Sequence, residues 1–435
     1  MIKVLLLDAW KIAGALAACA TLPGSLELLV LSAAALWPKG KGRPRGRPGP
    51  WRVAVVVPAH DEEASIASCV RSLLDADRGA MQVDVYVVAD NCTDRTAQVA
   101  RQAGAKVLTR TDDRERGKGY ALHFAFTSLG FTRQAQPSPQ HSPEPQRSPE
   151  PQRYDGVLIV DADTAVAANF IVEAAGAMRD GANAVQVRYL VRNLEESTRT
   201  RLMGVALRGF NVVRSLGRER LGLSVGLLGN GFGLRSETLQ TVPYLASSVV
   251  EDLEYHLSLV DAGLRVRFVN ATTVLGEMPV RGAGVKTQRS RWEGGRLRMM
   301  LENSPRLLGK VLRGRPRFIE PLAELLLLPL AFHVTLLALA ISTPQPLVRD
   351  LGLAGVAVVL LHLVAAIVAG GGGWRDAITL AVAPFYVLWK LMLIPSLLRN
   401  ARTDQAWVRT QRSAEQEAGN APAAAPDPGQ GDPRP

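Results

Sequence analysis

The sequence of 435 residues predicts an α/β protein in which one mostly parallel sheet domain is flanked by transmembrane helices. Between residues 51 and 160, short apolar runs that favour strands alternate with helical patterns, which is typical of a parallel sheet covered on both faces. Residues 12–37, 322–343 and 351–370 form nearly uncharged apolar runs, each close to the ~20 residues that cross a bilayer as a helix. We therefore expect an integral membrane protein.

Residues 1–37 are predicted to form an N-terminal transmembrane anchor. The apolar run continues through Leu26–Trp37 and shows no clear small-residue cleavage site, unlike a cleavable signal peptide. Pro23 and Gly24 predict a kink inside it. Residues 38–50 are a basic linker rich in proline and glycine, and positive charge beside a span stays in the cytoplasm. The large domain that follows is therefore expected on the cytoplasmic side of the cell (inner) membrane, in a multi-pass protein.

The formal net charge of +11 admits a nucleic-acid partner, but basic residues beside spans usually set topology and contact anionic lipid head groups. We therefore expect membrane lipids, and no nucleic acid, as partners. Cys19, Cys69 and Cys92 show neither paired spacing nor a metal-ligand pattern, which favours free thiols in a reduced compartment.

The sheet domain is predicted over residues 51–310. Strands are expected at residues 53–57, 83–89, 105–109 and 157–160, and helices at 61–74, 93–103 and 118–129. Asp61 can cap the first of these helices, with Glu62 and Glu63 in its first turn. Residues 133–153 carry the unit SPEPQR twice in tandem, so we expect a disordered insertion there, with a polyproline ligand for a partner as the alternative.

Acidic residues follow three of the predicted strands. The first strand runs into Pro58 and Glu62, the second ends in Asp90, and the fourth ends in Asp161-Ala162-Asp163. In open α/β sheets, ligands bind beyond the carboxyl ends of the strands. In an extended segment Asp161 and Asp163 point to the same side, and such a pair can hold Mg²⁺ or Mn²⁺. The alternative for this pair is a solvated turn.

Two glycine-rich stretches are candidates for ligand contact. Lys118, between Gly117 and Gly119, opens a helix whose start favours anions, although a plain helix start explains it about as well. Residues 229–233, followed by Arg235, form a flexible polar stretch after an apolar run. That stretch either lines an acceptor site or is only a turn.

Two later motifs lie on predicted helices. Glu251 and Asp252 begin a helix that continues through Val260, where an acidic pair can also simply complement the helix dipole. Gln288, Arg291 and Trp292 are spaced three and four apart and share one helix face. Their amide, guanidinium and indole suit sugar hydroxyls, a diphosphate and a sugar ring; a membrane-facing basic helix is the alternative.

Taken in order, Asp90, Asp161-Ala162-Asp163, Glu251-Asp252 and Gln288-x-x-Arg291-Trp292 resemble the glycosyltransferase family 2 pattern over about residues 51–310. The set is most similar to the membrane-bound branch of cellulose, chitin, hyaluronan and poly-N-acetylglucosamine synthases, and ceramide glucosyltransferases share much of it. The resemblance implies the GT-A type, Rossmann-like fold of nucleotide-diphospho-sugar transferases. It also implies an inverting hexosyltransferase whose donor is a nucleotide-diphosphate sugar, expected to be a uridine diphosphate sugar.

The resemblance also implies roles for single residues. Pro58, Glu62, Asp90, Lys118 and Asp161 would bind the donor nucleotide. Asp161 and Asp163 would hold the Mg²⁺ or Mn²⁺ ion. Asp252 would be the general base, and the remaining positions would contact the diphosphate and the acceptor: Glu251, Gln288, Arg291 and Trp292.

The chain departs from the family pattern in two places. It has Ala89-Asp90-Asn91-Cys92 where paired aspartates and a small residue are common, and Val250-Glu251-Asp252 where many synthases have threonine. The first departure leaves the role of Asp90 open, and the second changes a contact beside the base.

The main interpretation is sugar transfer to a saccharide acceptor in polysaccharide synthesis. The alternative is non-processive glycosylation of a membrane lipid. A nucleotidyltransferase would need a glycine-rich, arginine-containing loop after the first strand, which residues 58–61 do not form. An inactive membrane scaffold would be favoured by loss of Asp163 or Asp252, and both are present.

Residues 318–398 are predicted to form C-terminal transmembrane or interfacial helices. Arg399, Arg402, Arg409 and Arg412 indicate that the tail, residues 399–435, is cytoplasmic, and we expect most of it to be disordered. Three C-terminal spans would place it outside, so the run 376–398, with Pro384, Lys390 and Pro395, is expected to be interfacial or re-entrant.

Overall fold

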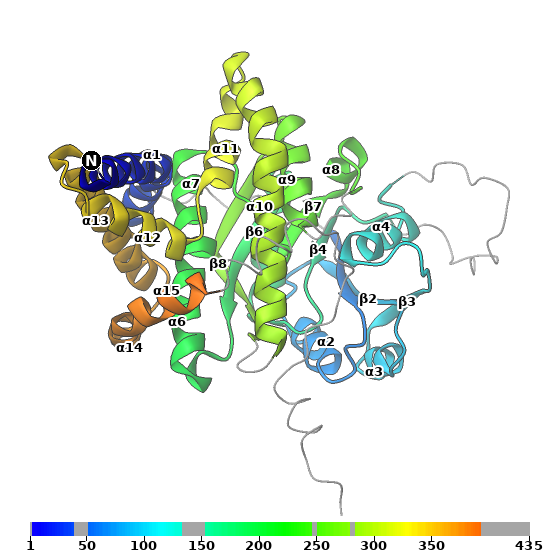
Figure 1. The fold of residues 1–435 in the computed structure, drawn as a ribbon. Coiled ribbons are helices and arrows are strands. Elements are labelled where there is room, and N and C mark those ends of the chain that lie inside the picture. The colour runs from blue at the N-terminus through cyan, green and yellow to red at the C-terminus, as the bar shows by residue number, and fades with distance from the viewer. Residues whose placement is uncertain (1, 39–50, 133–152, 246–249, 279–282, 393–435) are drawn as a thin grey trace, which may run out of the picture.

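The computed structural model describes residues 2–38, 51–132, 153–245, 250–278 and 283–392, and for residues 283–293 it describes the backbone alone. The predicted insertion (133–153), except its last residue, and the predicted tail (399–435) lie outside these ranges, as does most of the basic linker. Figure 1 shows a sheet with helices on both faces and, at one side of it, a group of apolar helices.

The sheet has eight strands in the order β3-β2-β1-β4-β7-β6-β8-β5. Strands β3, β2, β1 and β4 pair in parallel, and so do β6 and β8, whereas β7 runs antiparallel between β4 and β6. The short β5 adds an antiparallel edge to β8. The strand bounds are Arg52–Ala59 (β1), Gln82–Asp90 (β2), Lys106–Arg110 (β3), Gly156–Ile159 (β4), Ala165–Val166 (β5), Ala184–Val191 (β6), Phe232–Arg235 (β7) and Val266–Gly276 (β8). The four strands predicted from sequence agree with β1 to β4 to within two residues at each end.

Alternation along β1 divides the core into two layers, because successive side chains of a strand point to opposite faces. Val53, Val55 and Val57 face the helices α2 (Ile66–Leu74), α3 (Thr96–Gln102) and α5 (Phe170–Arg179). Ala54 and Val56 face α4 (Lys118–Ser128), α9 (Glu251–Asp261) and α7 (Ser215–Leu221). Both faces of the sheet are therefore covered, as a run of buried β-branched residues predicts.

The helix predicted over residues 61–74 begins later, at Ile66. Asp61 has a φ of 53°, and its carboxylate accepts hydrogen bonds from the Thr93 and Asp94 backbone N–H groups at 2.7 and 3.3 Å. The Glu63 carboxylate likewise accepts from the Arg95 N–H at 3.1 Å. The prediction that Asp61 caps its own helix was wrong, because these carboxylates satisfy the loop after β2 instead.

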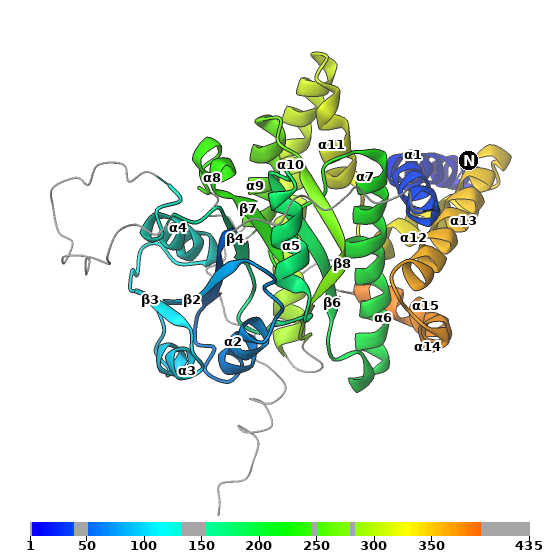
Figure 2. The same cartoon turned by 180° about the vertical axis from the view of Figure 1, so that it is seen from behind.

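One long helical segment separates the sheet from the apolar helices (Figures 1 and 2). It consists of α6 (Thr198–Leu207), a π-helical stretch η2 (Arg208–Arg214) and α7. A second long helix, α10 (Ala283–Leu312), lies on the same side of the sheet as α9, and the short α8 (Ser236–Thr241) follows β7. These elements bring polar residues between the sheet and the apolar layer.

Among the described residues, two helices are long and apolar enough to cross a membrane: α1 (Ile2–Leu36) and α13 (Pro346–Val368). The expected span over 322–343 is not one straight helix, since α11 (Ile319–Leu326) and α12 (Leu330–Ile341) are bent by 81° at residues 327–329. Pro329 precedes α12 and lacks the N–H that would continue α11. This bent pair is a third span only if both helices cross together.

The described part of the run 376–398 forms two short helices, α14 (Trp374–Thr379) and α15 (Ala383–Leu391), joined by a 3₁₀ turn. Neither is long enough to cross a bilayer, so an interfacial or re-entrant position remains the prediction for this run. The helix α1 packs against α12, α13 and α7, so the apolar layer is joined directly to the sheet domain.

Candidate active site

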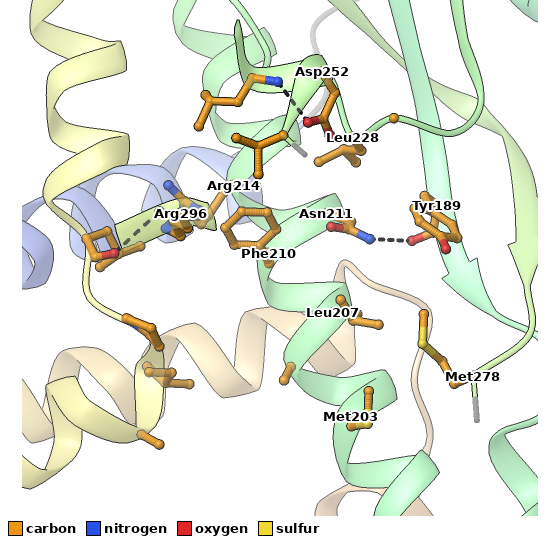
Figure 3. Close-up of a pocket in the computed structure, with 18 of the residues that line it drawn as sticks. Tyr189, Met203, Leu207, Phe210, Asn211, Arg214, Leu228, Asp252, Met278 and Arg296 are labelled. Carbon is orange, nitrogen blue, oxygen red and sulfur yellow. Dashed lines mark hydrogen bonds between the residues drawn. The ribbon is translucent and has the colours of Figure 1, made fainter. Parts of the chain in front are cut away.

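A cavity of about 1570 Å³ opens beyond the carboxyl ends of β1, β2 and β4. Figure 3 shows the part of it between η2 and β6, with Asp252 at one side and Arg214 and Arg296 at another. The structure brings eight of the predicted site residues to its wall: Pro58, Glu62, Asp90, Lys118, Asp161, Asp163, Glu251 and Asp252. The segment with Gln288, Arg291 and Trp292 is helical within α10, and their side chains lie outside the described part of the chain.

Asp161 and Asp163 follow β4 in a tight turn, which the Thr164 N–H closes by donating to the Asp161 carbonyl at 3.1 Å. The extended geometry expected for this pair is therefore wrong, yet both residues line the cavity. Asn230 holds the turn: its Oδ1 accepts from the Asp161 N–H at 3.1 Å, and its Nδ2 donates to Thr164 Oγ1 at 2.8 Å. Asn230 is fully buried, so the position of the two carboxylates is set by the core.

Lys118 joins three parts of the site. Its ammonium group pairs with the Asp161 carboxylate and donates to the Gly229 carbonyl at 2.7 Å. Gly229 has a φ of +75°, and a Cβ atom there would lie 3.3 Å from Asp252 Oδ2. A glycine at this position therefore lets the Asp252 carboxylate approach the loop and the lysine closely.

Burial raises the pKa of two neighbouring carboxylates of the site, Glu251 and Asp252. Burial, and then the neighbouring Asp252, raises the pKa of Glu251 to about 8. Burial also raises the pKa of Asp252, against the opposing effect of the Leu253 N–H and of Lys118. Burial alone would lower the pKa of Lys118, but Asp161 and Glu251 outweigh it, so the lysine stays positively charged. Lys118 is thus a single cation among several acidic groups: Asp161, Glu251 and Asp252.

The donor set suits a divalent cation. Asp161 and Asp163 offer hard carboxylate oxygens from one turn, which is the ligand type that Mg²⁺ and Mn²⁺ prefer. The described residues also contain one group of three possible metal ligands, Asp61, Cys92 and Asp94. Their ligand atoms lie within 4.8 Å of one another. Asp61 and Asp94 already accept backbone hydrogen bonds from Thr93 and Thr96, so we assign them to the loop and not to a metal.

Residues 48–295 match the model of the family described as glycosyltransferase like family 2, which is more than half of the chain. The protein belongs to glycosyltransferase family 2. It is 22% identical over 262 residues to the probable glycosyltransferase YdaM of Bacillus subtilis. This alignment covers 58% of this chain and 56% of that protein. It is 27% identical over 253 residues to a beta-monoglucosyldiacylglycerol synthase of Nostoc sp., in an alignment that covers 56% of this chain and 48% of that protein. The chain therefore spans about half the length of these curated relatives.

A solved structure shares the fold over most of the chain. It is a mannosyltransferase from Pyrobaculum calidifontis in complex with GDP-Man and Mn²⁺, with a TM-score of 0.51 and 16% sequence identity. The match covers 90% of this chain and 97% of that one. This similarity and the family match confirm the predicted family and the GT-A-like fold of nucleotide-sugar transferases. The assignment to the cellulose, chitin and hyaluronan branch stays a prediction.

Within this family 2 domain, Asp90 is almost fully buried, and Arg110 Nη1 donates to its Oδ1 at 2.8 Å. The Asp90 carbonyl accepts a hydrogen bond from His60 Nδ1 at 2.8 Å. The next residue, Asn91, has a φ of 51° and accepts from the Asp112 N–H at 2.7 Å. The departure from the family pattern at Asn91 thus fits a left-handed position, which asparagine tolerates.

Sequence reasoning missed several residues of the site. Arg110 could not be found, because nothing near it in sequence marks it as the partner of Asp90. Asn230 lies in the stretch 229–233, which the sequence did single out, but its role in holding the Asp161 turn was not predicted. Phe210, Asn211 and Arg214 line the cavity from η2, within a segment to which no site was assigned.

Proposed function

We propose that the protein transfers a sugar, with inversion, from a nucleotide-diphosphate sugar to a membrane-lipid acceptor, with a divalent cation at Asp161 and Asp163. The observation that carries this proposal is the continuity of the cavity. Its wall includes the family's carboxylates at one end and side chains of α12, α13 and α15 at the other. A donor and an apolar acceptor can therefore meet in one space.

At the donor end, Asp161 and Asp163 would hold Mg²⁺ or Mn²⁺, which would neutralise the negative charge that grows on the diphosphate as it leaves. Lys118 lies beside them and is positively charged, so it is placed to contact the same phosphates. Glu62 and Asp90 lie on the same wall, where they would position the nucleoside. The solved mannosyltransferase, with GDP-Man and Mn²⁺, is consistent with such a donor and ion.

At the centre, Asp252 would act as the general base. The acceptor hydroxyl oxygen would attack the anomeric carbon, the bond to the diphosphate would break, and the hydroxyl proton would pass to the Asp252 carboxylate. The raised pKa of Asp252 makes its carboxylate a better proton acceptor than a free aspartate. A single displacement of this kind inverts the configuration at the anomeric carbon.

At the far end, the cavity wall is mostly apolar, although Thr335, His362 and Lys390 also line it. Its residues come from the two helices α12 and α13 and from α15, and include Leu330, Val334, Ala338, Val356, Val359, Leu360, Leu363 and Leu391. Because α13 is long and apolar enough to cross a membrane, this wall is placed to receive the hydrocarbon chain of a lipid. The name of the Nostoc relative, a glucosyldiacylglycerol synthase, is in line with a lipid acceptor.

The lipid acceptor is the alternative that the sequence left open, and the apolar wall favours it over a saccharide. The predicted cytoplasmic position of the domain fits this proposal, because soluble nucleotide sugars would reach the carboxylates while the lipid remains in the membrane. In such a protein α1 and α13 would anchor the domain at the inner face of the cell membrane.

The test is sugar transfer by the full chain in lipid nanodiscs, with a panel of uridine and guanosine diphosphate sugars and with Mg²⁺ or Mn²⁺. We expect metal-dependent release of nucleoside diphosphate from one donor, together with a glycolipid of one added sugar. Asp252→Asn should abolish transfer, while Asp261→Asn at the end of the same helix should leave it unchanged. Release without any lipid product, but with long saccharide chains, would establish the polysaccharide alternative. No release with any donor or acceptor would overturn the proposal.

A further inference from the structure

Six charged side chains meet where the sheet domain contacts the apolar helices. They come from five elements: Glu27 (α1), Arg214 (η2), Arg218 (α7), Arg296 (α10), and Glu320 and Glu324 (α11). Glu27 Oε1 accepts from Arg214 Nη2 at 2.7 Å and from Arg218 Nη2 at 2.8 Å. Arg218 also pairs with Glu320 through Nε, and its Nη2 lies 3.4 Å from Glu324 Oε2. The Arg218 guanidinium is thus surrounded by carboxylates, which suits a structural ion pair.

Arg214 and Arg296 differ from Arg218, because both line the cavity (Figure 3). Arg214 is only 1% exposed, and both of its carboxylate contacts, to Glu27 at 2.7 Å and to Glu324 at 3.9 Å, are made through Nη2. Its Nε and Nη1 have no hydrogen-bond partner in the part of the chain that the structure describes. Arg296 donates through Nη2 to the carbonyls of Glu324 and Leu327, and none of its nitrogens lies within 4.0 Å of a described carboxylate. Buried guanidinium donors are rarely left without acceptors, so a ligand that accepts hydrogen bonds is expected here.

The two guanidinium groups are close to each other. Their Cζ atoms lie 4.6 Å (Arg214) and 5.3 Å (Arg296) from the centre of the same ring, Phe210. Burial, and then the positive charge of Arg214, lowers the pKa of Arg296 to about 10. The two guanidinium groups therefore repel each other. An anion between or beside the two groups would remove that repulsion.

This pair lies close to the proposed base. A Cβ atom at Gly226 would be 3.3 Å from Glu324 Oε2, and one at Gly229 would be 3.3 Å from Asp252 Oδ2. Gly226 and Gly229 are three residues apart, and three residues of chain span at most about 11 Å, so the ionic cluster and the base lie at the two ends of one short loop. The apolar wall begins at the same level, since Leu327 and Leu330 line the cavity beside the cluster.

We propose that Arg214 and Arg296 bind the phosphate of a phosphate-bearing membrane lipid, which is the acceptor; this inference rests on the proposed function. A guanidinium offers two parallel N–H donors that match two phosphate oxygens. The phosphate would be held at the polar end of the apolar wall, and the hydrocarbon chains would extend along α12 and α13. A neutral lipid would leave the same donors unpaired and would bind less tightly.

The first experiment measures lipid binding without turnover. The full chain in detergent is titrated with fluorescent phosphatidylglycerol, a fluorescent polyprenyl monophosphate and fluorescent diacylglycerol, with inorganic phosphate as a soluble competitor. We expect the wild-type protein to prefer at least one phosphate-bearing lipid over diacylglycerol by about tenfold or more, and inorganic phosphate to compete only at high concentration. Equal affinity for all three lipids, or displacement by inorganic phosphate at the lipid's own concentration, would overturn the proposal.

The second experiment uses a matched pair of variants on α10. Arg296→Met removes the guanidinium from the cavity, whereas Arg298→Met removes one that is exposed and pairs with Glu302. We expect Arg296→Met to lose about tenfold in affinity for the phosphate-bearing lipid with diacylglycerol binding unchanged, and Arg298→Met to behave as wild type. A loss of affinity for both lipids alike would indicate a structural role and overturn the proposal. If Arg296→Met does not fold, the wild-type preference alone decides the question.

The two proposals fail separately. Phosphate-selective binding without any sugar transfer would overturn the proposed function and leave the lipid site in place. Transfer to diacylglycerol at the same kcat/KM as to the phosphate-bearing lipids would support the proposed function and overturn the phosphate site.

Discussion

Replacing Gly229 with alanine should slow sugar transfer far more than the same replacement at Gly222. Both glycines have a φ of +75°, a conformation that costs a residue with a side chain about 1–2 kcal/mol. The new methyl group at Gly222 would meet nothing within 4 Å, but at Gly229 it would lie 3.3 Å from Asp252 Oδ2 and 3.7 Å from Lys118 Nζ. The two variants therefore share the backbone cost and differ in the contact with the proposed base.

The size of the effect follows from that contact. A separation of 3.3 Å is short of ordinary van der Waals contact, so the Asp252 carboxylate must move by a few tenths of an ångström. Since a displacement of ~1 Å at a reacting group costs roughly 100-fold in rate, we expect kcat to fall about fivefold to tenfold in Gly229→Ala.

The assay is nucleoside diphosphate release by each variant in nanodiscs at saturating donor and lipid, with chemical denaturation to measure the free energy of unfolding. We expect both variants to lose about 1–2 kcal/mol of that free energy and only Gly229→Ala to lose rate. Equal kcat values for the two variants would refute the reasoning that Gly229 sets the position of Asp252.

Three further predictions concern other parts of the domain. Arg110→Met should lower the free energy of unfolding by about 3–5 kcal/mol, because it leaves the Asp90 carboxylate buried and unpaired. Arg95→Met removes an exposed ion pair with Glu63 and should change this free energy by less than about 1 kcal/mol. Denaturant titration measures both values. Burial lowers the pKa of His256 to about 4, so the unfolded chain takes up a proton below about pH 6.5 that the folded one refuses, and the free energy of unfolding should fall by about 3 kcal/mol between pH 6.5 and 4. His256→Gln should flatten that part of the profile, and an unchanged slope would contradict the assignment. A chelator should abolish donor turnover and added Mg²⁺ or Mn²⁺ should restore it, except in Asp163→Ala; turnover that survives chelation would exclude the metal at this site.

Local pattern was sufficient for the half of the sheet that comes first in the chain. The run of apolar residues at 53–57 predicted a central strand covered on both faces, and in β1 all five of these residues are buried. The strands that end in Asp90 and Asp161 followed from the same apolar runs, and their parallel pairing brought these carboxylates to one edge.

The parts that could not be predicted depend on contacts between distant segments. The Asp61 carboxylate caps the loop after β2, and no local rule distinguishes that from capping its own helix. Arg110 is the partner of Asp90 only because β3 pairs with β2 in a register that sets these two residues side by side. Asn230 reaches the Asp161 turn because β7 inserts antiparallel next to β4, an arrangement that the order of elements in the chain does not specify.

The π-helical stretch η2 explains how chemistry at the sheet is tied to the apolar layer. Asn211 donates to the Tyr189 carbonyl of β6 at 2.9 Å, Arg208 pairs with Asp376 of α14 at 2.6 Å, and Arg214 pairs with Glu27 of α1 at 2.7 Å. One short segment thus makes buried polar contacts to the sheet, to the C-terminal helices and to the N-terminal helix. Such contacts are directional, so they hold the carboxylates of the cavity at a fixed position relative to the apolar helices. If those helices lie in a bilayer, that fixed position determines which atoms of a lipid head group can reach Asp252. The acceptor is then selected by the position of its hydroxyl group relative to the membrane as well as by its chemical structure.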